Sequence, residues 1–390
     1  MTLIADRLNR ISPSQTIAIS SKARALKAAG RDIISLSAGE PDFDTPEHIK
    51  QAAIAAIHAG DTKYTDVSGT PALRKAVAAK FKRDSGLDYS PEEIIVSTGG
   101  KQVIFNAMLA TVQAGDEVII PAPYWLSYPE MVKLADASPV IVETKEEHGF
   151  KLTPDEFRDA MTPATKLIIL NSPGNPTGSV YTHEELQALA EVALEEDILM
   201  LSDEIYEKIV YDGTEFVSLA SLSSEIYDLT ITVNGFSKAY AMTGWRLGYV
   251  AAPEHIAAAI DSIQSHSTSN PTSFAQKGAL AGLKGDQSFI GEMVKAFTER
   301  RAYMYDRLTK IPGVTCVKPM GAFYMLPKIS KFGLNSTAFC SKLLEEQKVA
   351  AVPGIAFGSD AHMRLSYACS MENIQKGLDR IEAFCKSLKS

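Results

Sequence analysis

The sequence predicts an α/β fold: a mostly parallel sheet covered by helices on both faces, with a smaller α+β domain built from both chain ends. Two observations support it. Short, almost continuously apolar runs alternate with helical segments between residues 94 and 251, as expected of buried parallel strands. From about Phe297 the pattern changes to a charged helix, a strand at 321–325 and a closing helix at 371–388. The predicted parts are an arm and part of the small domain (1–45), a large domain (46–296) and a small C-terminal domain (297–390).

The composition is that of an ordinary globular protein, with 45% apolar and 22% charged residues in a chain of 390. A net charge of −8 argues against extended contact with nucleic acid. Four scattered cysteines form neither a disulfide framework nor a zinc site, and they suit a reducing cytosol. No signal peptide and no apolar run long enough to cross a bilayer is visible. We therefore expect a cytoplasmic protein without a metal, a nucleic-acid partner or a membrane partner.

The first elements are marked by their start and stop residues. A turn and a helix are expected over 7–29, followed by a short strand at 33–36. Thr45-Pro46 and Thr70-Pro71 each place a capping residue before a proline at the first helical position. Helices are therefore expected from these points to about residues 59 and 84, where Gly60 and Gly86 follow.

The middle of the chain alternates between strands and helices. Strands are expected at 94–96, 117–120, 140–142, 166–170, 198–201 and 229–233, with another apolar run at 247–251. One helix begins after Gly99-Gly100, and another follows Thr182 with its apolar residues spaced along one face. In such sheets ligands bind beyond the carboxyl ends of the strands. The loops that carry chemically informative residues mostly follow strands directly.

The loop after the 229–233 strand carries Ser237 and Lys238, and Arg246 follows eight residues after the lysine. A lysine among small and aromatic residues is partly desolvated, which favours its neutral form. A neutral amine attacks carbonyl groups, and pyridoxal phosphate contains one. The guanidinium of Arg246 suits a phosphate. A lone lysine is more often an ordinary surface residue, so this interpretation depends on the other motifs.

Two more loops carry polar residues that suit the same ligand. Lys101 follows Gly99 and Gly100, whose turn lets backbone amides approach an anion at a helix N-terminus, although the pattern is not a P-loop. Asn175 lies between two prolines in Asn171–Gly178, directly after a strand. Each is also compatible with a purely structural turn, but the position of Asn-Pro-Thr-Gly at a strand end favours a functional role.

Two charged residues sit where an unpaired charge would be costly. Asp203 ends the 198–201 strand and needs a partner. A pyridinium N–H would serve, with Tyr206 donating to the phenolate oxygen of the same ring; capping the next helix is an equally good explanation for the motif alone. Arg364 lies between apolar neighbours in a strand-like run. An α-carboxylate would suit it, and an internal salt bridge is the rival explanation.

These motifs together resemble a known family. Gly39, Asn-Pro-Thr-Gly, Ser-Asp-Glu-Ile-Tyr, Ser-Lys with Trp-Arg-Leu-Gly-Tyr, and Arg-Leu-Ser-Tyr-Ala occur in the order found in class I aminotransferases of PLP fold type I. The resemblance covers the whole chain. The segments around Trp125, Gly99 and Arg246 are similar to those of bacterial aspartate aminotransferases of the gamma subgroup. The resemblance implies a seven-stranded large domain, a homodimer with shared active sites, and pyridoxal 5'-phosphate as cofactor.

The resemblance also implies a role for each residue. Lys238 would be the Schiff-base lysine and would move the proton during the reaction. Asp203 would hold the pyridine nitrogen, Asn175 and Tyr206 the phenolate oxygen, and Trp125 would stack on the ring. The phosphate end would be surrounded by Gly99, Gly100, Lys101 and Arg246, with Tyr64 contributed by the other subunit. Arg364 and the backbone of Gly39 would bind the substrate α-carboxylate.

This chain departs from the family pattern at two points. Family members often have a hydroxyl three residues before the lysine; here that residue is Gly235, and Ser237 is the possible substitute. Other members use an Arg from the partner subunit for a distal carboxylate, but residues 247–299 contain no Arg. We expect Lys101, with the hydroxyls of Ser14 and Thr16, to bind that carboxylate instead. The alternative is that Lys101 only neutralises the cofactor phosphate.

The predicted reaction is transamination of L-aspartate and 2-oxoglutarate to oxaloacetate and L-glutamate. An aromatic or prephenate aminotransferase is the nearest alternative, and a β-lyase is a more distant one. A PLP-binding regulatory module is disfavoured, because it would need a DNA-binding extension and the chain is acidic.

Overall fold

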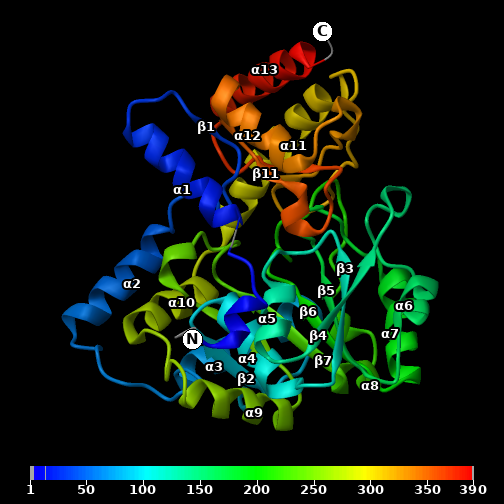
Figure 1. Cartoon of the computed structure of the whole chain (residues 1–390). Helices are drawn as coiled ribbons and strands as arrows, with labels where there is room; N and C mark the ends of the chain where they lie inside the picture. The colour runs from blue at the N-terminus through cyan, green and yellow to red at the C-terminus, as the bar shows by residue number, and fades with distance from the viewer. Residues whose placement is uncertain (1–3, 14, 389–390) are drawn as a thin grey trace.

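The computed structural model describes residues 4–13 and 15–388, and its largest element is a seven-stranded sheet (Figure 1). In spatial order its strands are β2 (Ile94–Ser97), β8 (Gly248–Ala251), β7 (Thr230–Gly235), β6 (Leu199–Asp203), β5 (Thr165–Asn171), β3 (Glu117–Ala122) and β4 (Ser138–Glu143). Strand β8 is antiparallel to both of its neighbours, and the other neighbouring pairs are parallel. The predicted mostly parallel sheet is thus confirmed.

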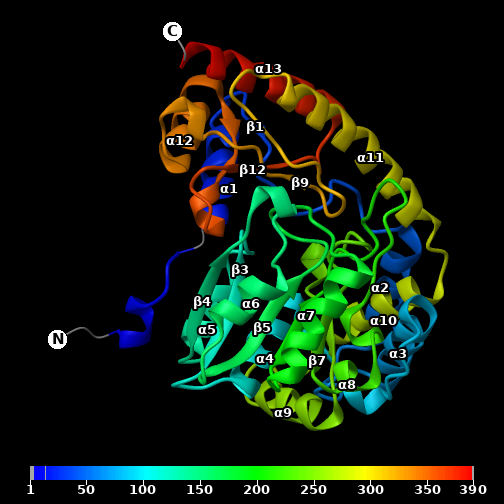
Figure 2. The same ribbon diagram turned by 90° about the vertical axis from the view of Figure 1, so that its right-hand side faces the viewer.

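Helices cover both faces of this sheet (Figures 1 and 2). One core cluster contains residues of α4 (Gly100–Thr111), α5 (Tyr128–Leu134) and α9 (Glu254–Ser265). Two further clusters contain residues of α2 (Glu47–His58), α3 (Pro71–Ser85), α6 (Pro154–Ala160), α7 (His183–Glu195), α8 (Ser224–Asp228) and α10 (Ser273–Lys284).

The alternation of side chains along each strand explains these layers. In β5, Leu167 and Ile169 pack in the α4–α5–α9 cluster, whereas Ile168 and Leu170 pack with α6 and α7 on the opposite face. Successive side chains of a strand point to opposite faces, so a strand buried on both sides must be apolar at nearly every position. This is why the strands appear in the sequence as continuous apolar runs.

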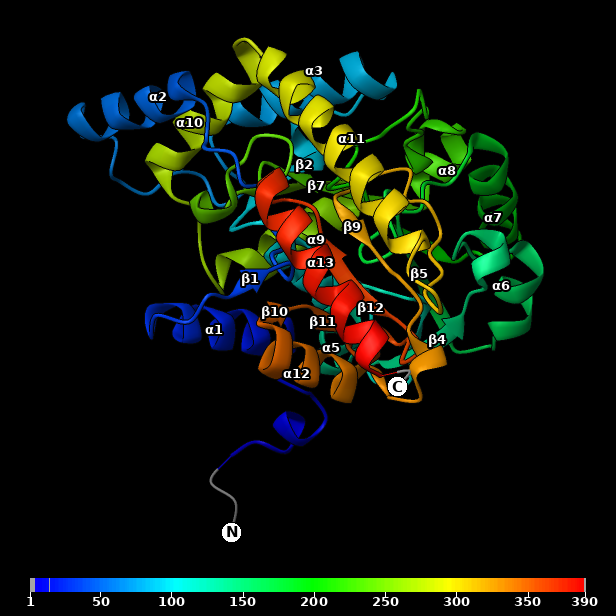
Figure 3. The ribbon, with the colours of Figure 1, turned by 90° about the horizontal axis from the view of Figure 1, so that it is seen from above.

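Both ends of the chain contribute to a second core. Strand β1 (Ile34–Ser35) pairs in parallel with β10 (Val349–Ala350), and β11 (Val352–Pro353), β12 (Met363–Ser366) and β9 (Tyr324–Met325) form an antiparallel sheet. The helices of this region are α1 (Gln15–Ala28), α11 (Ser288–Thr309), α12 (Ser336–Gln347) and α13 (Met371–Ser387). Figure 3 shows α13 beside α11, and their residues share one core cluster. The division at 45 and 296 stays a prediction, and its second boundary falls inside α11.

Short 3-10 helices complete the fold. They are η1 (Asp6–Asn9), η2 (Pro91–Glu93), η3 (Glu146–His148), η4 (Leu219–Ser221), η5 (Thr243–Trp245), η6 (Ser330–Phe332) and η7 (Gly354–Phe357). The first of them, η1, stands away from the body of the molecule (Figure 2). Within residues 4–13 and 15–388, no helix combines the length and the apolar character needed to cross a membrane.

Candidate active site

The predicted site residues meet at one edge of the seven-stranded sheet. The carboxyl ends of the parallel strands lie along this edge, and the loops that leave β2, β3, β5, β6 and β7 all carry predicted residues. Because β8 runs in the opposite direction, its amino end lies at the same edge, which brings Arg246 there as well. A cavity of about 350 Å³ opens at this edge. The predicted residues that line it are Gly39, Gly100, Lys101, Trp125, Asn175, Asp203, Tyr206, Ser237, Lys238, Arg246 and Arg364.

Two predicted residues, Gly99 and Tyr64, do not line the cavity. Gly99 lies immediately behind it and contacts Arg246. Tyr64 is on the surface, with 90% of its area exposed, beside a separate hollow. Ser14 lies outside the described residues, as does the side chain of Thr16. The role expected for Ser14 and Thr16 therefore stays a prediction.

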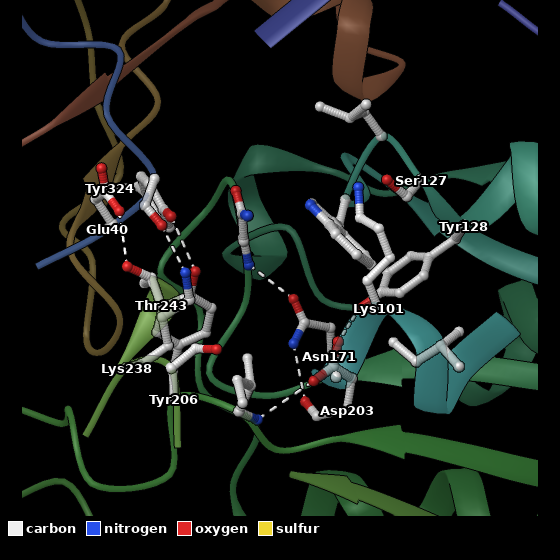
Figure 4. Close-up of a pocket in the computed structure, with 18 of the residues that line it drawn as sticks. Glu40, Lys101, Ser127, Tyr128, Asn171, Asp203, Tyr206, Lys238, Thr243 and Tyr324 are labelled. Carbon is white, nitrogen blue, oxygen red and sulfur yellow. Dashed lines mark hydrogen bonds between the residues drawn. The ribbon is translucent and has the colours of Figure 1, made fainter. Parts of the chain in front are cut away.

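Lys238 lies just after β7 with its ammonium directed into the cavity (Figure 4). Its Nζ donates a hydrogen bond to the carbonyl oxygen of Gly39 at 2.5 Å. Nζ also lies 5.7 Å from the ring centre of Tyr206 and 5.8 Å from that of Phe323. Burial lowers the pKa of Lys238 to about 8, although the charge of Glu40 opposes this shift. A neutral, nucleophilic amine is therefore accessible near physiological pH.

Asp203 ends β6 with its side chain on the face covered by α5. Its Oδ2 accepts a hydrogen bond of 2.6 Å from the hydroxyl of Tyr128, and both residues are buried. Its Oδ1 accepts a longer bond of 3.3 Å from the backbone N–H of Ile205. Burial raises the pKa of Asp203 to about 6, and the hydrogen bond from Tyr128 opposes that shift. The residues after Asp203 form a turn rather than a helix, so Asp203 does not cap a helix.

Arg364 on β12 is buried without an anionic partner among its hydrogen bonds. Its Nη1 donates to Asn175 Oδ1 and its Nη2 to the carbonyl of Ser37, each at 3.0 Å. Its Nε has no hydrogen-bond partner, and the guanidinium lies 4.4 Å from the ring centre of Tyr324. A buried guanidinium that lines a cavity and bonds only neutral acceptors suits a carboxylate ligand better than the internal salt bridge considered as the rival.

Two tyrosines and an acidic residue lie on the same side of the cavity as Lys238. The hydroxyls of Tyr206 and Tyr324 are 2.9 Å apart, and both side chains are buried. Glu40 accepts a hydrogen bond of 2.8 Å from the hydroxyl of Thr243. Figure 4 shows Lys238 surrounded by Tyr206, Tyr324, Glu40 and Thr243. The opposite side of the cavity carries Lys101, Ser127 and Tyr128.

The turn from β2 into α4 forms a narrow, positively charged end of the cavity. Gly99 has a φ of +89°, and a Cβ at this position would collide with the guanidinium of Arg246. Lys101 follows in the first turn of α4, with its Nζ 5.0 Å from the ring centre of Trp125. Burial, and secondarily the charge of Arg246, lowers the pKa of Lys101. Two cations at a helix N-terminus are disfavoured unless an anion binds between them.

Gly235 has a structural reason for lacking a side chain with a hydroxyl. Any Cβ at this position would lie 2.9 Å from the Cα of Gly248, because β7 and β8 approach closely here. A serine or threonine cannot fit without a backbone shift. Ser237 instead lines the cavity, in agreement with its suggested role as a substitute.

The donor set fits pyridoxal phosphate. A carbonyl needs an amine, a ring nitrogen needs a carboxylate, and a phosphate dianion needs cations and amides. Lys238, Asp203 and the Gly99–Lys101 turn with Arg246 supply these groups around one cavity. Arg364 lines the same cavity and has no acidic partner among its hydrogen bonds, so it suits a substrate carboxylate. The site therefore brings an amine, a carboxylate and two positively charged ends together around one cavity.

Several residues that line the cavity were not predicted from the sequence. Tyr128, Asn171, Glu40, Thr243 and Tyr324 all line the cavity. Asn171 binds the backbone of two strand-end loops, with Nδ2 donating to Asp203 O and Oδ1 accepting from Asn175 N, each at 2.8 Å. One signal was available for Tyr128, since it lies only three residues after Trp125 in the segment that follows β3. Tyr324 offered none, because its strand is far from the others in sequence.

Comparison with known proteins gives consistent results. The family described as "Aminotransferase class I and II" matches residues 31–381. An aspartate aminotransferase of Geobacillus stearothermophilus is 50% identical, covering 98% of this chain and 99% of the relative. An aspartate/prephenate aminotransferase of Cereibacter sphaeroides is 51% identical over the full length of both chains. The solved structure of Thermus thermophilus aspartate aminotransferase with maleate superimposes with a TM-score of 0.95 at 44% identity, covering 98% of this chain and 100% of the other.

Proposed function

Because this chain belongs to the class I and II aminotransferases, we propose that it transfers the amino group of L-aspartate to 2-oxoglutarate, giving oxaloacetate and L-glutamate. The cofactor is pyridoxal phosphate. The observation that carries the proposal is the meeting of Lys238, Asp203 and Arg364 around one cavity of about 350 Å³. A purely structural arrangement would not bury an amine, a carboxylate and a guanidinium without pairing them.

When bound, pyridoxal phosphate supplies a carbonyl group and an electron-withdrawing ring. Asp203 would keep a proton on the ring nitrogen, while Tyr128 holds the other carboxylate oxygen and fixes its orientation. Asn175 and Tyr206 would bind the phenolate oxygen, and Trp125 would pack on the ring. The amides of Gly99 and Gly100, with Lys101, Ser237 and Arg246, would bind the phosphate.

Lys238 would act both as the covalent anchor and as the base. In its neutral form, Nζ can accept a proton from the substrate Cα and return it at the neighbouring carbon of the cofactor. Burial makes the neutral form accessible by lowering the pKa of Lys238 to about 8. The carbonyl oxygen of Gly39 accepts a hydrogen bond from Nζ at 2.5 Å, which orients the amine at the cavity.

Arg364 would bind the α-carboxylate of every substrate, with the backbone of Gly39 beside it. We further propose that Lys101 binds the distal carboxylate, helped by hydroxyls of Ser14 and Thr16. Lys101 lies in the cavity beside Trp125, and its burial without a neighbouring acid favours an anionic ligand. An ammonium is a point charge without the planar fork of Arg. It should discriminate less sharply among distal groups.

Prephenate is a specific second candidate for the amino acceptor. It is supported by relatives such as the Cereibacter sphaeroides enzyme, whose name includes prephenate. Prephenate also has a second carboxylate, which Lys101 could bind in the same way.

We also propose a cytoplasmic homodimer with shared active sites. The four cysteines are free thiols, which suits a reducing compartment. Tyr64 is 90% exposed, and the projecting η1 leaves Ile4 and Leu8 exposed, as expected of segments that pack on a second copy.

The test of the reaction is a steady-state assay of the cofactor-loaded protein. A panel of amino donors would be supplied with 2-oxoglutarate, and aspartate would be supplied with prephenate and with 2-oxoglutarate. We expect the highest kcat/KM for aspartate with 2-oxoglutarate. A higher value for an aromatic or a short aliphatic amino acid would contradict the aspartate assignment while leaving the family unaffected.

The test of Lys101 is Lys101→Ser, with Lys310→Ser on the exposed end of α11 as control. Loss of a charge-assisted hydrogen bond worth roughly 1.5–3 kcal/mol should lower kcat/KM for aspartate about tenfold to a hundredfold, with little effect on phenylalanine. Equal losses for both substrates, together with weaker cofactor binding, would mean that Lys101 serves the phosphate alone.

A further inference from the structure

The loop of residues 61–70 joins α2 to α3 and presents Tyr64 to solvent. Tyr64 is 90% exposed, whereas most tyrosines in this chain are buried or half-buried. The loop and the segment before α10 border a surface hollow of about 550 Å³. An exposed tyrosine beside a hollow is accessible to a second copy of this chain, as the homodimer proposed above requires. Such a residue contributes to a site only if its loop is held in one conformation.

Gln276 on α10 holds this loop next to Tyr64. Its side chain is completely buried. Its Oε1 accepts a hydrogen bond of 2.7 Å from the backbone N–H of Thr70, and its Nε2 donates to the hydroxyl of Thr65 at 3.1 Å. Nε2 also donates to the carbonyl of Pro271 at 2.9 Å, which ties the loop to the segment across the hollow. One amide thus binds both ends of the stretch 65–70.

Gln264 on α9 holds the middle of the same stretch and is also completely buried. Its Nε2 donates to the carbonyls of Val67 and Val96, at 2.7 and 2.8 Å. Its Oε1 accepts from Ser97 at 2.5 Å and from Asn106 at 3.2 Å. Ser97 ends β2, so this amide joins the Tyr64 loop to the strand that leads into the Gly99–Lys101 turn.

The loop is also fixed by its own backbone and by its first residue. Gly69 has a φ of +94°, and a Cβ there would lie 2.9 Å from Val96 Cβ and 3.3 Å from Gln276 Oε1. Asp61 accepts a hydrogen bond of 2.7 Å at its carbonyl from Ser273 and forms an ion pair of 3.1 Å with Lys277. Contacts therefore fix the chain on both sides of Tyr64. Two buried amides with all these bonds satisfied are costly to rearrange, which favours a single loop conformation.

We propose that Gln276 is a positioning residue that holds Tyr64 for contact with the cofactor phosphate of a second copy of this chain. Gln264 on α9 supports the same loop. The proposal rests on the shared-site homodimer proposed above. In addition, helices α9 and α10 would fix the conformation of the Tyr64 loop within each subunit before the dimer forms. The residue that touches the phosphate is Tyr64, and Gln276 acts only through it.

The test is a double-mutant cycle read as affinity for pyridoxal phosphate. Cofactor-free protein, Tyr64→Phe, Gln276→Met and the double variant would be titrated with pyridoxal phosphate, and the dimer would be checked by sedimentation. We expect Tyr64→Phe and Gln276→Met each to weaken binding about tenfold, as for loss of one hydrogen bond to a charged group. In the Tyr64→Phe background, Gln276→Met should add less than about twofold, since both changes remove the same contact.

The other outcomes would contradict either the positioning role alone or the shared site as well. Equal losses from Gln276→Met in both backgrounds, accompanied by a lower melting temperature, would overturn the positioning role and leave the shared site intact. Native affinity in Tyr64→Phe would overturn the shared site and the positioning role together, whereas aspartate transamination would be unaffected. If Gln276→Met does not fold, Thr65→Val replaces it in the cycle. This change removes only the hydroxyl that accepts from Gln276, and it should show the same dependence on Tyr64.

Discussion

At the scale of single residues, the hydrogen bond from Tyr128 to Asp203 makes a testable contribution to cofactor binding. The bond is 2.6 Å long and opposes the rise in the pKa of Asp203 to about 6 that burial causes. Tyr128→Phe removes the donor, so the pKa should rise by about one unit, to near 7. Only the carboxylate can hold the ring nitrogen proton. The pKa of about 6 belongs to the cofactor-free protein, so the acid limb of its affinity for pyridoxal phosphate should move to higher pH, with a loss of several-fold at pH 6 and little loss at pH 8.

The control for that profile is Tyr227→Phe, which removes a similar bond of 2.7 Å to Glu93 away from the cavity. Its acid limb should coincide with that of the native protein. A Tyr128→Phe enzyme with a uniform loss at every pH would show that Tyr128 is needed for packing rather than for ionisation of Asp203.

Lys238 should leave a pH signature in the stability of the cofactor-free protein. Burial lowers its pKa from 10.5 to about 8, so between these values the unfolded chain binds more protons than the folded chain. The buried lysine therefore lowers the free energy of unfolding at neutral pH. This penalty disappears as the pH rises from 8 to 10.5. Lys238→Met should therefore be more stable than the native chain at pH 7, by up to about 3 kcal/mol. This advantage should shrink towards pH 10.5.

Urea denaturation of the two cofactor-free proteins between pH 7 and 10 measures this difference, with the exposed Lys331→Met as control. A difference between Lys238→Met and the native chain that stays constant over this range would contradict a depressed pKa for Lys238.

At the scale of elements, the turn between β2 and α4 is fitted to the loop before β8. Gly99 has a left-handed φ of +89°, and a Cβ there would collide with the guanidinium of Arg246. Gly99→Ala should strain the backbone and displace Arg246, and so weaken pyridoxal phosphate binding about tenfold. Gly244→Ala is the matched control, because a Cβ at Gly244 meets no atom within 4 Å. Titration of the cofactor-free variants measures both effects, and unchanged affinity in Gly99→Ala would remove Arg246 from the phosphate site.

At the scale of the whole molecule, the shared-site dimer predicts complementation between two inactive chains. Lys238→Ala lacks the amine but keeps Tyr64, and Tyr64→Ala keeps the amine. Mixed dimers would have one complete site, so random exchange should restore roughly a quarter of native activity. The measurement is activity after mixing, compared with the sum of the two variants alone. An active monomer in sedimentation, or no recovery after proven exchange, would disprove the shared site.

Several features followed from the sequence alone because their causes are local. Continuous apolar runs predicted the seven strands, since a strand buried on both faces has few polar positions. Motifs placed directly after these strands predicted the site, because carboxyl ends of parallel strands share an edge. Lys238 and Asp203 were found in this way, whereas Arg364 was found as an arginine between apolar neighbours in a strand-like run, and all three line one cavity. Helices α5, α6, α8, α9, α10 and α12 were not assigned from the sequence, although the capping residue Thr153 before α6 and the amphipathic pattern of α9 were available as signals.

Only the tertiary structure decided which of these residues touch. Tyr128 and Asp203 are 75 positions apart, and Arg364 and Asn175 are 189 apart. Their contacts depend on the order of strands in the sheet and on how the chain ends return to it, and neither is encoded in a local pattern. The same holds where backbones nearly meet. Gly235 lacks a side chain because Gly248 on the neighbouring antiparallel strand leaves no room for one. Periodicity and motifs predict the secondary structure, burial and local chemistry of each segment. Contacts between segments that are distant in the sequence form only when the chain folds.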